Sequence, residues 1–346
     1  MDIGIFQLLP RPTTRTDGEV VQQGLAEVDF AERHAFESVW IAEHHLSDFG
    51  IVGAPSVYAA AVAARTRRVR IGYGVAVVPL HHPLRLAEEI AWLQELSGGR
   101  VIVGVGPGFS PYEFGAFGVP LEEKHARLEE GVAIVRRALA GEEFSYDGRF
   151  WQIPRVSLRP RPRTMPPILR AASSDESLRV AAAEGSPVMF GLKPFEELAG
   201  RLAFSRSIMG REPETSVLRR IVVAPTDEEA IAAMRGPLVW EEAIAARVHE
   251  GQLADGSHID AHDVVRTALR SACCGSPATV ARQLRELREL GVQRVIGWFH
   301  FGDMPYETVM RSMELLATEV LPALREEELA LDAGRETSGA PAGVAP

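Results

Sequence analysis

Polar side chains that could exchange protons or bind an anion follow several apolar runs of the sequence. They are Glu43-His44-His45, His81-His82, Ser173-Ser174, and His300 with Asp303. Because imidazole can donate, accept or transfer a proton near neutral pH, His44 and His45 are the leading candidates for acid–base chemistry. Consecutive side chains at a strand end point to opposite sides, so we expect at most one of these two imidazoles to face a pocket.

A metal site and a purely structural pair are the alternatives for these two histidines. Two ligands on the same side of a strand would require the pattern His-x-His, whereas His44 and His45 are adjacent. No dense set of aspartates and histidines accompanies them. We therefore predict no metal here and favour acid–base or hydrogen-bonding use, with a structural pair as the open alternative.

Two further segments have the composition of cofactor contacts. The glycine-rich stretch 104–108 follows an apolar run, but Pro107 and the glycine spacing do not match a dinucleotide-binding fingerprint. Its glycines, Gly104 among them, could serve either close approach to a flat ligand or a tight turn. The segment 173–177 opens a helix, where free backbone N–H groups and hydroxyls can hold a phosphate. The same residues could form a plain helix cap, which the acidic Asp175 and Glu176 favour.

Eight short runs rich in apolar and β-branched residues are available to position these side chains. They are Ile3–Leu9, Ser38–Ala42, Val69–Val78, Val101–Val105, Ile168–Ala172, Pro187–Gly191, Val217–Val223 and Arg294–His300. Runs that are apolar on both faces are typical of parallel strands covered by helices. Amphipathic segments with helical spacing lie between them, as at 20–34, 84–96, 124–139 and 278–290.

This alternation of strand and helix, repeated about eight times, predicts a (β/α)8 barrel rather than an open doubly wound sheet. In such a barrel the active site lies at the carboxyl ends of the strands, which is where the polar residues above fall. We predict one domain over residues 1–325. We also predict an acidic, then Gly-, Ala- and Pro-rich, disordered tail over residues 326–346.

One stretch does not fit the simple repeat. Residues Trp240–Gly275 form an insertion before the last βα unit and include polar and glycine positions. A mobile cover over the strand ends and an ordinary surface excursion are both consistent with this composition.

The composition excludes several classes of partner. Of the 346 residues, 46% are hydrophobic and 24% charged, and the net charge is −10 without a basic cluster, so we expect no nucleic-acid partner. No apolar stretch is long enough to cross a bilayer, and residues 1–9 do not resemble a signal peptide, so we expect a cytoplasmic protein without a membrane partner. Cys273 and Cys274 are adjacent, which suits neither a zinc site nor a disulfide framework, so we expect reduced thiols without a chemical role.

Small residues on one predicted helix suggest self-association. The segment 54–64 carries alanines at the spacing of a helix face, namely Ala59, Ala60, Ala63 and Ala64. They would let another helix approach closely, as in a homodimer, or could simply pack against the barrel.

The sequence resembles the bacterial luciferase-like flavin-dependent monooxygenases over nearly its whole length, to about Leu324. The segments that carry the resemblance are Ala42–Gly50, Gly72–Pro83, Leu93–Gly104 with its Ser97-Gly98-Gly99-Arg100, Gly115–Pro120 and Gly275–Val280, in this order.

The resemblance implies a barrel that takes reduced FMN from a separate NAD(P)H:flavin reductase and reacts it with O2 to give a flavin C4a-hydroperoxide. One oxygen atom then enters a small organic substrate by hydroxylation, epoxidation or aldehyde oxidation. By position, His44 would assist proton movement beside the flavin, and Gly74-Val75 would form a cis peptide behind its ring. The phosphate-binding turn would consist of Ser173, Ser174 and Ser177.

The chain departs from the family pattern at one place. Many relatives have an arginine for the phosphate in the turn after the fourth strand, where this chain has Val105 and Pro107. The departure implies modest flavin affinity, as suits a reduced flavin that arrives from a reductase. Two other functions remain open, namely hydride transfer with the deazaflavin F420 and non-catalytic flavin binding.

Overall fold

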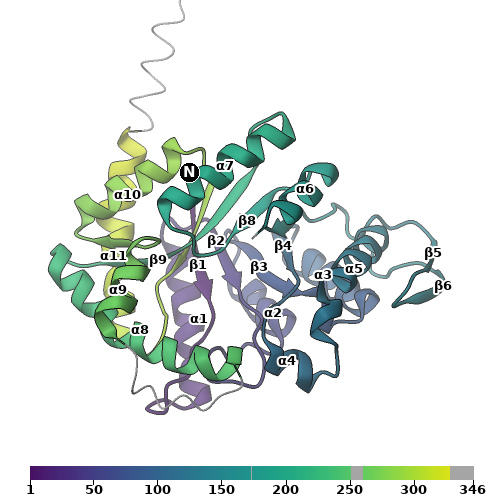
Figure 1. Ribbon diagram of the computed structural model, residues 1–346, viewed down its shortest axis with the longest axis horizontal. Helices are drawn as coiled ribbons and strands as arrows, with labels where there is room; N and C mark the ends of the chain where they lie inside the picture. The colour runs from purple at the N-terminus through teal and green to yellow at the C-terminus, as the bar shows by residue number, and fades with distance from the viewer. Residues whose placement is uncertain (173, 251–259, 328–346) are drawn as a thin grey trace, which may run out of the picture.

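The computed structural model describes residues 1–172, 174–250 and 260–327, and it contains a closed barrel of eight parallel strands (Figure 1). Each strand overlaps one of the eight predicted runs. The barrel strands are β1 Asp2–Gln7, β2 Ser38–Ile41, β3 Arg70–Val77, β4 Val101–Gly106, β7 Ile168–Ala171, β8 Val188–Phe190, β9 Thr215–Val223 and β11 Arg294–Trp298. The predicted (β/α)8 fold is therefore confirmed.

The register shows how the barrel closes. Gly4 of β1 pairs with Ser38 of β2 on one side and with Ile296 of β11 on the other. At the far side of the barrel, Val188 of β8 pairs with Thr215 of β9. Each of the eight barrel strands is thus paired on both sides, which closes the barrel.

Helices surround the strands, and the first ones show why the chain becomes helical where it does. Thr16 caps α1 with Glu19 in a capping box, and prolines occupy the first turns of α2 and α3. The helices are α1 Asp17–Arg33, α2 Pro55–Arg65, α3 Pro83–Leu96, α4 Pro111–Ala116, α5 Lys124–Leu139, α6 Asp175–Glu184, α7 Phe195–Met209, α8 Asp227–Glu250, α9 Ala261–Leu269, α10 Pro277–Glu289 and α11 Tyr306–Leu315. Residues 316–320 continue α11 as a π-helical turn, and short 3-10 turns occur at 78–80 and 121–123.

The core is continuous from the barrel interior to the helix layer. Trp40 of β2 is fully buried, and a β-carbon on Gly72 of the neighbouring strand would lie 2.4 Å from its ring. Glycine is therefore required at position 72 so that the indole can pack flat against β3.

The predicted insertion Trp240–Gly275 falls partly outside the described residues, which omit 251–259. In its described part α8 continues to Glu250, α9 follows, and β10 (Cys273–Gly275) pairs with the end of β9. Helix α8 packs against α4, which lies among the loops at the carboxyl ends of the strands. Helix α8 contains Pro237, and Gly302 packs against the backbone of this proline. A β-carbon on Gly302 would lie 2.0 Å from the Pro237 carbonyl oxygen.

Other parts of the chain add detail that the sequence did not reveal. Residues 144–147 (β5) and 152–156 (β6) form an antiparallel hairpin outside the barrel. Residues 321–327 are helical, and the rest of the predicted tail, 328–346, lies outside the described residues. The assignment of 1–325 to one domain stays a prediction. Among the helices that the structure describes, none has the length and apolar character needed to span a bilayer.

Candidate active site at the carboxyl ends of the strands

His44 lies just beyond β2 and is held by a carboxylate from a different part of the chain. Its Nδ1 is 3.0 Å from Oε1 of Glu113, and the same oxygen accepts the backbone N–H of His45 at 2.9 Å. Glu113 belongs to α4 and is 2% exposed, and its own N–H is capped by Ser110. Donation from Nδ1–H to Glu113 leaves Nε2 of a neutral His44 as the atom that can accept a proton.

Aromatic rings enclose His44. Phe49 makes an edge contact with a centroid distance of 4.9 Å, and Phe109 makes another at 5.7 Å. Only 13% of the His44 side chain is exposed, whereas Phe109 is about half-exposed. The imidazole therefore reaches solvent through a narrow, apolar opening.

His45 turns to a second carboxylate. Its Nε2 lies 3.0 Å from Oε1 of Glu43, which also receives His81 Nε2 at 2.8 Å, while the backbone N–H of Val77 donates to Oε2 at 2.9 Å. Burial alone would raise the pKa of Glu43, but these hydrogen bonds and the charge of His81 lower it to about 2. Burial would lower the pKa of His81, yet its hydrogen bond and charge interaction with Glu43 raise it. Glu43 and His81 therefore form a buried ion pair.

The segment predicted to contact a flavin ring lies at the end of β3. The Gly74–Val75 peptide is cis, and the pairing of β3 with β4 shifts register there. Both residues are partly exposed although most of the strand is buried. The side chain of Val75 covers Gly104, where a β-carbon would also meet the Tyr73 carbonyl at 2.4 Å. The lack of a side chain at Gly104 thus reflects close packing of strands, while the flavin contact of Gly74 and Val75 stays a prediction.

The predicted phosphate turn is a capping box at the start of α6. Ser174 Oγ accepts the N–H of Ser177, and Ser177 Oγ accepts the N–H of Ser174; Ser173 lies outside the described residues. Arg201 of α7 pairs with Asp175 in this first turn, yet its buried Nε and Nη2 have no partner among the described residues. A guanidinium with two unpartnered nitrogens beside a helix N-terminus fits an anionic group such as a phosphate.

His300 takes part in a separate buried network. Its Nδ1 lies 2.6 Å from Glu27, and its Nε2 lies 2.9 Å from Nη1 of Arg15. Because arginine can only donate, Nε2 must accept, so His300 is the neutral Nδ1–H tautomer. The network continues from Glu27 to Gln7, which shows that His300 fastens the β1–α1 loop rather than facing a cavity. Within the part of the chain that the structure describes, no hydrogen bond or ion pair joins Asp303 or His82 to these groups.

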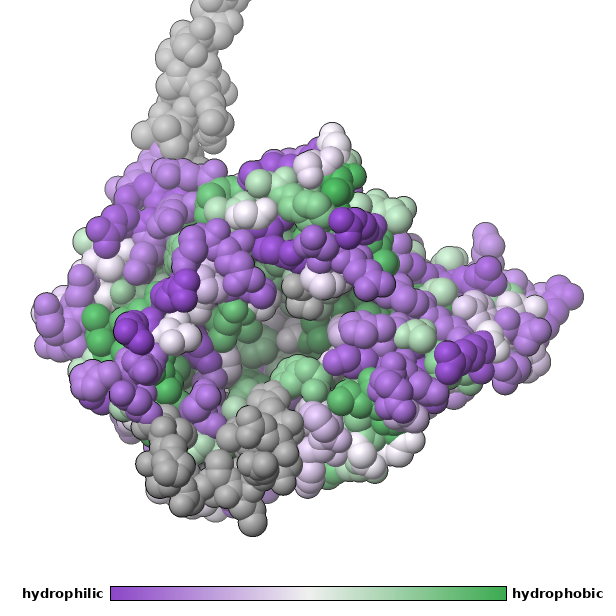
Figure 2. All heavy atoms as spheres, in the orientation of Figure 1, coloured by the Kyte–Doolittle hydropathy of each residue, from purple (hydrophilic) through white to green (hydrophobic). Residues whose placement is uncertain are grey.

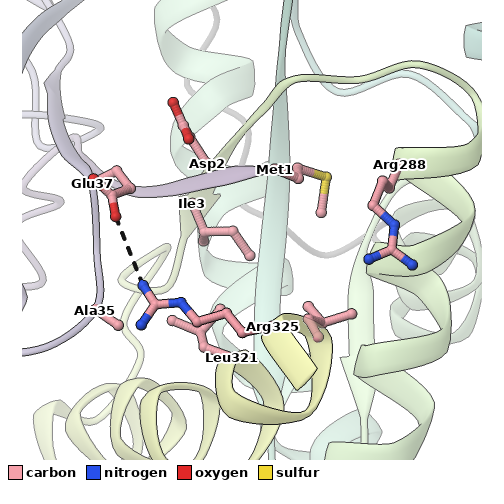
Figure 3. Close-up of a pocket in the computed structure, with 9 residues that line it drawn as sticks. Met1, Asp2, Ile3, Ala35, Glu37, Arg288, Leu321 and Arg325 are labelled. Carbon is pink, nitrogen blue, oxygen red and sulfur yellow. Dashed lines mark ion pairs between the residues drawn. The ribbon is translucent and has the colours of Figure 1, made fainter. Parts of the chain in front are cut away.

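The surface is hollowed on the side shown in Figure 2, where largely apolar walls are surrounded by hydrophilic residues. A different cavity, of about 210 Å³, opens beside Met1, Asp2 and Ile3 (Figure 3). Because β1 begins at Asp2, that cavity lies at the amino ends of the strands, where a barrel of this kind does not place its active site. An ion pair at 3.8 Å between Arg325 and Glu37 lies along its wall.

No set of three histidine, cysteine or acidic side chains among the described residues has the arrangement of a metal site. Cys273 and Cys274 are free and buried on β10, where burial raises the pKa of each thiol to about 12. Thiols of such high pKa are protonated and poorly nucleophilic at neutral pH.

Comparison with known proteins identifies the family of this chain. The family model for luciferase-like monooxygenases matches residues 1–294. The chain is 26% identical to the oxygenase component of flavin-dependent trigonelline monooxygenase from Acinetobacter baylyi, over 91% of this chain and 93% of that protein. The crystal structure of monooxygenase RslO1 from Streptomyces bottropensis is 29% identical and superimposes with a TM-score of 0.84, covering 93% of this chain and 99% of that one.

A further solved structure is similar in fold alone. It is the oxygenating constituent of 3,6-diketocamphane monooxygenase from Pseudomonas putida in complex with FMN, at 20% identity and a TM-score of 0.76, covering 93% of this chain and 98% of that chain. The fold and the family match thus define an enzyme on a (β/α)8 barrel. The chain belongs to the luciferase-like monooxygenase family.

Sequence reasoning missed two residues of the site. Glu113 is 69 positions from His44 and lies in a six-residue helix, so no local pattern links the two. Arg201 lies in the middle of α7, where an arginine is ordinary. For Glu113 the available signal was a lone acidic residue three positions after Ser110, at the start of a helix.

Proposed function

We propose that this enzyme is a two-component monooxygenase that binds reduced FMN and inserts one atom of O2 into an organic substrate. The observation that carries the proposal is the position of the His44–Glu113 pair at the end of β2, next to the partly exposed Gly74–Val75 segment of the neighbouring β3. A ring held against Gly74 and Val75 would have an oriented imidazole at the end of the adjoining strand.

Residues of α6 and α7 fit the phosphate of FMN. The phosphate would lie at the first turn of α6, near Ser174 and Ser177, with Arg201 supplying a positive charge. Arg201 would replace the phosphate-binding arginine that many relatives have in the turn after β4 and that this chain lacks. Bound reduced FMN would supply the two electrons that activate oxygen, with one oxygen atom entering the substrate and the other leaving as water.

His44 would control a proton beside the reacting oxygen. Its Nδ1–H donates to Glu113, so the ring is fixed in orientation and its Nε2 is free to hold or accept a proton. Phe49 and Phe109 restrict water around the imidazole, which protects a reactive oxygen species from premature loss. Glu113 is a positioning residue in this scheme, because it acts through His44.

A partner must reduce the flavin. The chain contains no dinucleotide-binding fingerprint, so we propose that a separate NAD(P)H:flavin reductase delivers reduced FMN. The relative from Acinetobacter baylyi is named as an oxygenase component, which supports the same division of labour.

The experiment is to mix the protein anaerobically with reduced FMN or with reduced F420 and then to add 18O2 and pools of candidate substrates. We expect the FMN reaction to place one 18O atom in a product seen by mass spectrometry, and to release hydrogen peroxide when substrate is withheld. Hydride transfer from F420 without oxygen consumption would contradict the proposal and indicate the F420 alternative. Flavin binding with no reaction in either mixture would indicate a non-catalytic flavin-binding protein.

We also propose that two copies associate through α2 and α3. A groove of about 680 Å³ lies between these helices, and beside it the large side chains of Val57, Trp92 and Leu96 are 72%, 66% and 57% exposed. Of the four predicted alanines, Ala59 and Ala63 pack inward, while Ala60 and Ala64 are not buried and allow a second helix to approach closely. Sedimentation velocity should give a dimer for the wild type and a monomer for Trp92→Glu; an unchanged dimer would contradict this interface.

A further inference from the structure

Arg220 places a positive charge on the inner side of the barrel wall. It is paired in register with Trp298 of β11, and its guanidinium lies 4.8 Å from the centroid of that ring and 5.5 Å from that of Phe301. Trp298 in turn contacts Phe6 edge to face at 5.5 Å, and Phe6 lies against Gly74, where an added β-carbon would come within 3.2 Å of its ring. Arg220 therefore joins the same aromatic wall that reaches the proposed flavin segment.

The guanidinium is poorly satisfied for a group so deeply placed. Its one hydrogen bond within the described part of the chain is an ion pair with Glu241 of α8, and the two side chains are 12% and 11% exposed. Arg220 Nε and Glu241 Oε2 are both buried without a partner there. Burial raises the pKa of Glu241, although Arg220 acts in the opposite direction. A buried donor and a buried acceptor left open in this way each destabilise the folded protein until a ligand satisfies them.

The pair borders a cavity of about 360 Å³. The cavity lies between the β8–α7 loop, α8 and α9, and its wall includes Leu192, Leu238, Thr267 and Ala268 beside the Arg220–Glu241 pair. A cavity of this size suits a small organic molecule. Its wall combines apolar side chains with the Arg220–Glu241 pair, and the further charged residues Glu242 and Asp263 border it.

We propose that the Arg220–Glu241 pair is a substrate-recognition site for a flat or apolar molecule carrying a neutral group with an adjacent donor and acceptor, such as a carboxamide or lactam. This inference rests on the proposed function, because the molecule bound there is taken to be the one that is oxygenated. The substrate carbonyl accepts from the open Nε of Arg220, and its N–H donates to Oε2 of Glu241. Rotation of the Glu241 carboxylate about its terminal bond is enough to turn this oxygen toward the cavity.

A neutral group fits this pair better than an ion. A carboxylate would be repelled by Glu241 and by Glu242 and Asp263, which also border the cavity. An ammonium group would be repelled by the positive charge of Arg220. A group that both donates and accepts satisfies the two open atoms without adding a charge to a site of low polarity.

The test is calorimetric titration of the full chain, without flavin or oxygen, with four probes that share one ring system. They are indole-3-acetamide, indole-3-acetate, tryptamine and 3-methylindole. The wild type should bind the amide about tenfold or more tightly than each of the others, because only the amide makes both hydrogen bonds. The double variant R220M/E241M should lose this preference, and it should fold, since apolar replacement of a buried ion pair is often neutral or stabilising.

The matched control is Arg219→Met, which removes the adjacent arginine on the opposite face of β9, where it stacks on Phe195 instead. This variant should keep the amide preference. Equal affinity for all four probes, tightest binding of the acetate or the amine, or an amide preference that survives in R220M/E241M would each overturn the proposal. Since no step needs flavin, failure here leaves the oxygen chemistry intact, and failure of the FMN experiment leaves this result interpretable.

Discussion

His44 and His45 are neighbours in the chain but belong to two hydrogen-bonded groups with different properties. The first group joins His44 to Glu113, beside an apolar opening lined by Phe49 and Phe109. The second joins His45 and His81 to Glu43, a carboxylate with no exposed side-chain surface. One group leaves an imidazole nitrogen for chemistry, whereas the other uses its polar atoms to fasten the ends of β2 and β3 together.

The difference shows that residue type alone does not identify a catalytic histidine. Both imidazoles face a glutamate at 3.0 Å. They differ in the hydrogen bonds that the glutamate accepts. Glu113 accepts from His44 and from a backbone N–H, whereas Glu43 accepts from two histidine side chains and a backbone N–H. We therefore expect changes in the His44 group to alter chemistry, and changes in the His45 group to alter stability.

The largest expected effect comes from His44→Ala. This change should lower product formation by about 10²- to 10⁴-fold while leaving the thermal midpoint near that of the wild type, because a positioned acid or base contributes a factor of this size. His45→Ala is the matched control and should lower the midpoint more than the rate. Equal kinetic losses in both variants, without destabilisation of His45→Ala, would remove the distinction between the two groups.

The next effect is on stability and comes from Glu43→Gln. An uncharged amide cannot balance the His81 cation, so we expect unfolding free energy to fall by about 3 kcal/mol, as for one partner lost from a buried ion pair. Chemical denaturation measures this quantity. Glu122→Gln, on an exposed residue, is the control and should change little. A stable Glu43→Gln protein with slow chemistry would mean that the two groups are functionally one.

How much of this arrangement could be predicted depends on sequence separation. The eight barrel strands follow from their runs of β-branched residues, and His44 follows from its place at a strand end. Glu113 could not be found, because it is brought to His44 only when the β4–α4 segment closes over β2. The three-residue β10 is too short to give a periodic signal. Arg220 could have been noticed, since two consecutive arginines interrupt an otherwise apolar strand. No sequence pattern, however, links Arg220 to Glu241.

A smaller loss of rate should follow Glu113→Gln. The amide can still accept from Nδ1–H but carries no charge, so we expect about a 10- to 100-fold fall in product formation and a shifted pH profile, as His44 loses its counter-charge. Glu113→Asp retains the charge and should recover part of the rate. A pH profile identical to that of the wild type would indicate that Glu113 is only a packing residue.

The smallest effect concerns pH and the Glu43–His81 ion pair. Because the pKa of His81 is raised above 6.5, its contribution to stability is complete below that pH and is lost as pH rises through the raised pKa. The pKa of Glu43 is lowered from 4.5 to about 2, so its contribution is present above pH 4.5 and is lost as pH falls through 2. The destabilisation caused by His81→Gln should therefore be greatest between these limits and shrink at high pH. His82→Gln, whose side chain makes no cap bond, should show no such dependence.

The most direct test of the central claim follows hydrogen peroxide release after reduced FMN, bound to the protein without substrate, is mixed with oxygen. Our account predicts that the wild type delays this release relative to free reduced FMN. His44→Ala should shorten the delay most, Glu113→Gln less, and His45→Ala least among variants that bind flavin. Release at the rate of free reduced FMN from the wild type, or an unchanged delay in His44→Ala, would contradict the assignment of the His44–Glu113 pair as the centre of oxygen chemistry.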